Sequence, residues 1–128
     1  MAGNSSEKNS SIAPIPHIST HILDQAIGLP ASRVSVELSI MNEAGQWDHL
    51  ESHFTNSDGR AQFQTPLKKA NYKIHFLITE YYQQQKKTLG VDTFFLNPEI
   101  AFRIEDTHRK YHVPLLLSPF GYSTYRGS

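Results

Sequence analysis

The stretch "RVSVELSI", residues 33–40, carries the clearest structural signal in the chain. Apolar and polar residues alternate along it without a break, which would place four apolar side chains on one face: Val34, Val36, Leu38 and Ile40. Successive side chains of an extended strand point to opposite faces, and β-branched residues favour such strands. The alternation therefore predicts a half-buried β-strand with one face against a core.

The same period of two recurs along the chain. The further segments are "HISTHILD" (17–24), "WDHLESHF" (47–54), "YKIHFLIT" (72–79), "EIAFRIED" (99–106), "YHVPLLL" (111–117) and "YSTYRG" (122–127). Sequences typical of turns separate them, namely "IGLPAS", "NEAGQ", "TNSDGR" and "SPFG". Seven or eight short strands of this kind predict an all-β fold, an antiparallel β-sandwich.

One segment differs in pattern. "EYYQQQKKT" (80–88) has no β-branched residue before Thr88, and Gly90 follows as a helix stop. We expect a single short helix of two or three turns there. The whole chain of 128 residues fits one domain over residues 17–128, preceded by a flexible tail over residues 1–16 that is rich in Ser, Asn and Pro.

Composition excludes several classes of function. Twelve Lys and Arg balance twelve Asp and Glu, so no net field favours nucleic acid or a membrane surface. Cysteine is absent, which excludes disulfides, thiolate nucleophiles and zinc-thiolate sites. No apolar run approaches the roughly 20 residues of a membrane helix. Phosphate-binding loops, nucleophile elbows and helical zinc motifs are also missing from the sequence.

Histidine is the residue type that stands out, with seven in the chain. In "RKYHVPLLLSP", His112, Pro114 and Leu116 share one face of the predicted strand, and the other face is also apolar. We therefore expect a cover on both faces, with a partner subunit as the second cover. Pro114 lacks an N–H, which favours an edge strand or an irregular pairing.

His112 then opens an apolar face, and His21 occupies a similar position in "HISTHILD". Two histidines at such an interface could form a partly enclosed site, since histidine exchanges protons near neutral pH. Two other interpretations stay open at this point. Each histidine could be structural, or the pair could hold zinc, although zinc normally takes three or four protein ligands.

Three separated stretches resemble one family. "ISTHILDQAIGLPAS", "TNSDGR" and "YHVPLLLSPFGYSTYRGS" are similar to the 5-hydroxyisourate hydrolases, the enzymatic relatives of transthyretin. The resemblance implies a transthyretin-like sandwich of two four-stranded sheets with one short helix. It also implies a homotetramer, built as a dimer of dimers with clefts between the dimers. The implied reaction is hydrolysis of 5-hydroxyisourate, in which an amide bond of its six-membered ring is opened during urate degradation.

The resemblance also implies site residues. The histidine of the first stretch is His21, the arginine that closes the second is Arg60, and the histidine before "VPLLLSP" is His112. We expect these three to be catalytic, with the histidines activating water and Arg60 binding substrate or the oxyanion. Substrate-binding residues are expected in the terminal motif, Tyr125, Arg126, Gly127 and Ser128. Neither a metal nor another cofactor is expected.

The chain departs from the family pattern at one position. Many relatives have His-Tyr-His where this chain has Lys110-Tyr111-His112, and we expect position 110 to lie outside the immediate surroundings of the site. His108 cannot replace that histidine by register. The alternative function is a transthyretin-type protein that binds a small ligand without catalysis. Because no apolar leader and no Ser-Lys-Leu-type ending are present, we expect a cytoplasmic protein, with a peroxisomal location as the alternative.

Overall fold

The computed structural model describes residues 15–128 except 90–91. The predicted tail over residues 1–16 and the predicted helix stop at Gly90 therefore fall wholly or mostly outside the described residues. The described elements, in chain order, are β1 (Ile18–Asp24), β2 (Leu29–Pro30), β3 (Ser35–Met41), β4 (Trp47–Phe54), β5 (Arg60–Gln62), β6 (Ala70–Leu77), α1 (Ile78–Leu89), β7 (Glu99–Ile104), β8 (Tyr111–Ser118) and β9 (Gly121–Thr124).

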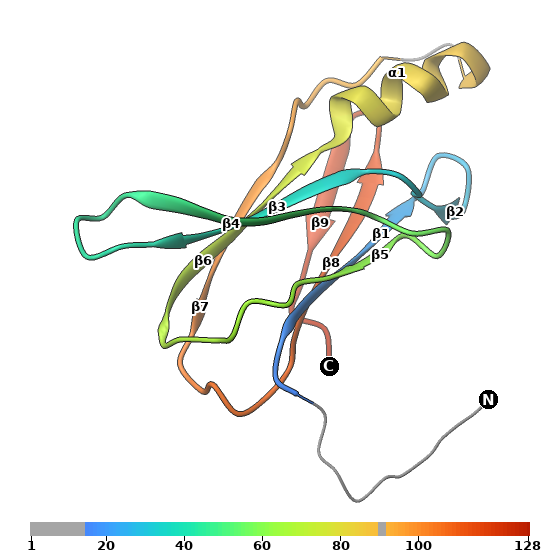
Figure 1. The fold of residues 1–128 in the computed structure, drawn as a ribbon. Coiled ribbons are helices and arrows are strands. Elements are labelled where there is room, and N and C mark those ends of the chain that lie inside the picture. Colours follow the sequence, from blue (N-terminus) through green and yellow to red (C-terminus); the bar gives the residue numbers. More distant parts are fainter. Residues whose placement is uncertain (1–14, 90–91) are drawn as a thin grey trace, which may run out of the picture.

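Two sheets pack face to face, which confirms the predicted β-sandwich (Figure 1). The smaller sheet has the order β4-β3-β6-β7. The larger sheet has the order β2-β1-β8-β9, and β5 also pairs with β1, so this sheet has five strands where four were expected. The helix α1 lies at one end of the sandwich, and the C-terminus lies near the other end (Figure 1).

The larger sheet is mixed, so the prediction of a wholly antiparallel sandwich is wrong for one pair of strands. β1 and β8 run parallel, with Ser19 opposite His112 and His21 opposite Pro114, whereas β1 pairs antiparallel with both β2 and β5. β1 is thus flanked by β8 along one edge and by β5 along the first half of the other edge. This arrangement gathers residues from three distant parts of the sequence around residues 19–21.

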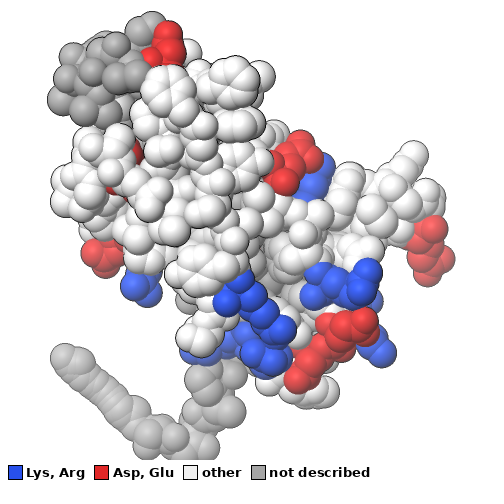
Figure 2. Space-filling model, turned by 180° about the vertical axis from the view of Figure 1, so that it is seen from behind, with Lys and Arg blue, Asp and Glu red and all other residues white. Residues whose placement is uncertain are grey.

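Charged side chains are unevenly spread on the surface. In the view from behind, they lie mainly along the lower part and the sides, and the area above the blue cluster is largely uncharged (Figure 2). Several large apolar side chains of the described residues are exposed in the segment after α1 and around β9: Phe94, Phe95, Leu96, Phe120 and Tyr122. Exposed apolar surface of this size is typical of contact with another protein chain.

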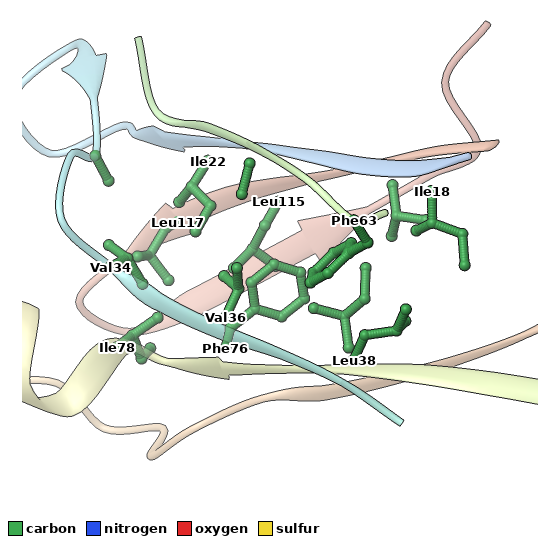
Figure 3. Packing of buried hydrophobic residues seen from close by; sticks show 14 of the residues in the cluster. Ile18, Ile22, Val34, Val36, Leu38, Phe63, Phe76, Ile78, Leu115 and Leu117 are labelled. Atoms are coloured by element: carbon green, nitrogen blue, oxygen red, sulfur yellow. The ribbon is translucent and has the colours of Figure 1, made fainter. Parts of the chain in front are cut away.

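The core lies between the sheets and follows the predicted alternation (Figure 3). Val34, Val36 and Leu38 from β3 and the turn before it are at most 1% exposed, and Ile74 and Phe76 from β6 are fully buried. Burying each such side chain contributes about 1.5–3 kcal/mol to folding. The odd-numbered residues of β8 also belong to this core, which leaves its even-numbered residues on the outer face.

The helix begins earlier than predicted. Ile78 and Thr79 continue the alternation of the preceding strand, but they form the first turn of α1. The side chain of Asn97 explains the change, because its Oδ1 accepts hydrogen bonds from the N–H and the hydroxyl of Thr79. These bonds cap the N-terminus of the helix from a residue 18 positions away, so the local sequence could not predict where the helix begins.

β8 is an interior strand, so the prediction of an edge position for Pro114 is wrong. The irregular pairing offered as the alternative is observed on the β9 side. Regular pairing ends at Leu115 and Thr124, and it resumes only as an isolated bridge between His112 and Gly127. Pro114 lies in this break, where its carbonyl accepts a hydrogen bond from Thr124 Oγ1 at 2.7 Å.

Within the part of the chain that the structure describes, α1 is the only helix, and it is neither long nor apolar enough to cross a membrane.

Candidate active site

β1 places the predicted catalytic residues side by side. His21 is the register partner of Arg60 on β5, and Ser19, two residues earlier, is the register partner of His112 on β8. Ser19 and His21 share the outer face of the sheet, because Ile18, Thr20 and Ile22 are buried on the inner face. Gly127 joins the group from the opposite side through its bridge to His112. Strand pairing alone therefore brings His21, Arg60, His112 and Gly127 together.

A cleft of about 510 Å³ opens at this place on the outer face. It is lined by His17, Ser19, Thr20, Asn56, Arg60, Ala61, Gln62, Lys110, His112 and Ser128. His21 lines an adjoining hollow together with Pro30, Asp58 and Arg60. Arg60 borders both depressions and so connects the surroundings of the two predicted histidines. Polar groups dominate the cleft, as expected for a site that binds a polar ring.

The two histidines face each other at a distance that excludes a direct bond. Their ring centroids are 6.5 Å apart, with a tilt of 37°. His112 Nδ1 lies 2.9 Å from Ser19 Oγ. Burial lowers the pKa of His112 below its usual value, and the charges of His21 and Arg60 lower it further. His112 is therefore held neutral at physiological pH, the state in which an imidazole accepts a proton.

A tight turn presents Arg60. Asn56 Oδ1 accepts hydrogen bonds from the N–H groups of Asp58 and Arg60, and the Asn56 N–H donates to the Arg60 carbonyl. Gly59 closes the turn with a φ of 76°, and a Cβ there would lie 2.5 Å from the carbonyl oxygen of Ile22. The Gly59 carbonyl also accepts the Ile22 N–H at 2.8 Å. The predicted Asp-Gly turn thus fixes Arg60 against β1.

The terminal motif divides between two places. Ser128 lines the cleft, and Gly127 lies against His112. The Gly127 N–H donates to the His112 carbonyl at 2.8 Å, and a Cβ on Gly127 would lie 2.6 Å from His112 Cδ2. Tyr125 and Arg126 instead line a smaller, mainly apolar hollow of about 160 Å³. The Arg126 guanidinium lies 5.2 Å from the ring centre of Tyr111, which anchors this part of the chain.

Ser19 and Lys110 are among the cleft residues that were not anticipated from the sequence. Ser19 lies two residues before His21, so the alternation of side chains along a strand could have predicted that both occupy the same face. Lys110 was expected outside the immediate surroundings of the site, but it lines the cleft with His112 because it directly precedes β8. His108 is no substitute for it, since its side chain is 91% exposed and does not line the cleft.

The donor set around the histidines bears on the zinc alternative. No group of three or more His, Cys, Asp or Glu side chains with metal-binding geometry occurs in residues 15–89 and 92–128. A catalytic zinc ion normally takes three protein ligands. His17 and Asp58 border the cleft and the adjoining hollow, but among the described residues they form no cluster of three ligands with His21 and His112, so the residues present do not fit a zinc centre.

Comparison with known proteins accords with this geometry. The sequence model of the HIUase/Transthyretin family matches residues 18–127. The chain belongs to the HIUase/Transthyretin family. A relative in Salmonella dublin named 5-hydroxyisourate hydrolase is 43% identical over 114 residues, which cover 87% of this chain and 80% of the relative.

Two solved structures represent the two branches of the HIUase/Transthyretin family. The 5-hydroxyisourate hydrolase of Klebsiella pneumoniae has a TM-score of 0.73 and 36% identity, and the match covers 88% of this chain and 99% of that one. Sea bream transthyretin in complex with thyroxine has a TM-score of 0.77 and 27% identity, and the match covers 86% and 93%. Because both share the fold, only the site residues can discriminate between their functions.

Proposed function

We propose that this protein is a hydrolase of the cyclic amide 5-hydroxyisourate. The observation that carries the proposal is the convergence of His21, Arg60 and His112 on two adjoining depressions of the larger sheet, with Arg60 bordering both. Relatives of the same name, at 43% identity in Salmonella dublin and 40% in mouse, support the substrate class.

The first step is activation of water. A separation of 6.5 Å between the imidazole centres leaves space for one small molecule between them. Neutral His112 takes a proton from this water, and the resulting hydroxide adds to a ring carbonyl carbon of the substrate. Charge then develops on the carbonyl oxygen, where the planar fork of Arg60 donors stabilises it.

The second step opens the ring. The C–N bond breaks as the tetrahedral intermediate collapses, the ring nitrogen receives a proton, and the carboxylic acid that forms releases its own proton to solvent. The proton taken from water is returned through the histidine pair, so the protein ends in its starting state. His21 shares this role, because it lies on the other side of the water position and borders Arg60. No step requires a metal or another cofactor.

The terminal motif completes substrate binding. Ser128 lines the cleft, Gly127 lies against His112, and Tyr125 and Arg126 follow β9 and line the smaller hollow. We assign substrate binding to all four residues, with Ser128 in contact with the ring and Arg126 acting through the backbone that it anchors. Deletion of residues 125–128 is expected to reduce turnover more than it reduces the melting temperature.

We further propose a homotetramer that pairs the outer faces of β8 and β9 between dimers. On this face Leu116 is only partly covered within one chain. A second copy would bury it and would narrow the open cleft. Light scattering coupled to size exclusion tests this directly, with a mass of four chains expected and a monomer as the contradicting result.

The deciding experiment measures hydrolysis of freshly generated substrate, with the spontaneous rate subtracted. We expect turnover by the parent chain and a loss of roughly 10²–10⁴-fold in His112→Gln, the range for a general base. His75→Gln is the matched control, because His75 lies on the outer face of the other sheet. Equal turnover by His112→Gln and the parent would contradict the proposed site.

The transthyretin-type alternative makes the opposite prediction. A carrier would bind an apolar ligand with no turnover, and its ligand site would be lined mainly by apolar groups.

A further test adds a chelator to the hydrolysis assay. Turnover that is lost in chelator and restored by zinc would contradict a mechanism that runs on His21, Arg60 and His112 alone.

A further inference from the structure

Two contacts hold the His112 imidazole in one orientation. On one edge, its Nδ1 lies 2.9 Å from Ser19 Oγ. On the other edge, the backbone of Gly127 lies so close that an added Cβ would be 2.6 Å from Cδ2. A flip of the ring by 180° would exchange Nδ1 with Cδ2, lose the Ser19 contact and place a polar nitrogen against Gly127. The remaining nitrogen, Nε2, is thus the one at the free tip of the ring.

The Ser19 contact is built into the sheet and does not depend on a mobile loop. Ser19 and His112 are register partners on parallel strands, and both point to the outer face. The neighbouring hydroxyl, Thr20 Oγ1, donates to the Val113 carbonyl at 2.6 Å on the inner face. β1 and β8 are therefore joined by side chains on both faces at this point, which fixes the position of Ser19.

The groups around His112 favour the neutral form of its imidazole. His21 projects from β1, Arg60 from β5, and Lys110 precedes β8 at the same cleft. No acidic side chain is among the cleft-lining residues. A neutral imidazole carries its single proton on either nitrogen, and the partner of one nitrogen decides which. For His112 that partner is Ser19, whose hydroxyl oxygen can accept an Nδ1–H.

We infer that Ser19 is a positioning residue that accepts the Nδ1–H of His112 and thereby leaves Nε2 unprotonated. In this tautomer the lone pair of Nε2 is available to take a proton from water. The catalytic consequence rests on the proposed hydrolase function, whereas the tautomer itself does not. Ser19 acts through His112 and needs no contact with the substrate.

The tautomer is measured first, without substrate. Nitrogen NMR of the parent protein at about pH 8.5, well above the reference pKa of about 6.5, should show a protonated Nδ1 and an unprotonated Nε2 for His112. In Ser19→Ala the signals should shift to a mixture of tautomers. In Ser19→Thr, which retains the hydroxyl, the parent pattern should return. Ser39→Ala, on a strand of the other sheet, serves as the matched control.

Kinetics then report the consequence. Ser19→Ala should lower kcat by roughly 10-fold to 100-fold with little change in KM, the effect typical of losing the partner that orients a functional histidine. Ser19→Thr should regain most of that loss. A parent spectrum with the proton on Nε2, or a Ser19→Ala protein with parental spectrum and kcat, would overturn the inference. If the parent itself shows no turnover, the hydrolase proposal fails, while the NMR result still decides the tautomer.

Discussion

The outer faces of the two sheets differ in whether their positive side chains have acidic partners. On the four-stranded sheet, Lys73 Nζ lies 2.8 Å from Glu99 Oε1 and 4.9 Å from the centre of the Trp47 ring system. His75 lies between two carboxylates, 3.7 Å from Glu37 and 3.8 Å from Glu99. Every positive group in this cluster has an acidic neighbour, as expected for a surface that contributes only to stability.

The five-stranded sheet shows the contrary pattern. Arg60 and Lys110 form no ion pair with any of the described residues, and both line the same cleft as His112. Positive groups without acidic partners cost stability, and the charge of Arg60 adds to the effect of burial in lowering the pKa of His112. Such an arrangement is retained where a ligand supplies the missing negative charge. The comparison therefore separates a structural face from a functional one.

The largest effect in this comparison is expected from removing the positive charge of Arg60, with removal of the Lys73 charge on the other sheet as the reference. Arg60→Gln should reduce turnover by roughly 10²–10³-fold, the loss typical of one oxyanion donor. Lys73→Gln should leave turnover unchanged, because its charge is already paired. Arg60→Gln should also raise the pKa of His112, since removal of a nearby positive charge favours the protonated imidazole.

NMR titration of His112 measures that pKa, and the acid limb of the pH–rate profile should move to higher pH with it. An unchanged or lower pKa of His112 in Arg60→Gln would show that the two groups do not interact, and the contrast between the faces would fail.

The next effect is steric and compares two glycines near the same strand. Gly127→Ala places a methyl group against His112, and we expect a loss of about 10²-fold in turnover, as for a displacement of about 1 Å in a catalytic group. Gly121→Ala meets only an ordinary contact at 3.8 Å from Ser118 Oγ and should retain turnover. Similar losses in both variants would contradict the role of Gly127 in leaving space for His112.

The third effect concerns stability on the four-stranded sheet. The Glu51 carboxylate accepts hydrogen bonds from the Gln64 and Thr65 N–H groups, the Thr65 hydroxyl and His53. Burial raises its pKa, but these bonds outweigh burial and lower the pKa from 4.5 to about 2. Glu51→Gln should therefore reduce the free energy of unfolding by about 1–3 kcal/mol at pH 7 without a change in kcat.

The sign of the pH dependence follows from that lowered pKa. The contribution of Glu51 to stability is complete above pH 4.5 and is lost as the pH falls towards about 2. Denaturant titrations between these values should show a steeper loss for the parent than for Glu51→Gln. Parallel curves would mean that the ionised form of the Glu51 carboxylate does not contribute to stability.

The smallest effect is expected at Lys110. This ammonium lines the exposed cleft, so Lys110→Gln should raise KM only a few-fold, in line with the modest value of an exposed charge interaction. Added salt should weaken substrate binding in the parent more than in the variant. A large fall in kcat with unchanged KM would instead place Lys110 among the catalytic groups.

Local sequence patterns account for much of the fold. The alternation in "RVSVELSI" and "YKIHFLIT" correctly identified buried faces, because side-chain direction in a strand depends only on residue number. The Asp58-Gly59 turn was predictable for the same reason, since it rests on local backbone geometry. The helix start and the short strands β2 and β5 were missed, because Asn97 and β1 decide them from a distance.

The site shows the same division. The sequence by itself determined the residue types: the motifs placed His21, Arg60, His112 and the ending Tyr125–Ser128 among the candidates, and family resemblance supplied the reaction. It could not determine that β1 runs parallel to an interior β8, which sets Ser19 beside His112 and admits Lys110 to the cleft. Only the tertiary structure decided these relations, because strand register and order depend on pairing between segments about 90 residues apart, and no local pattern records them.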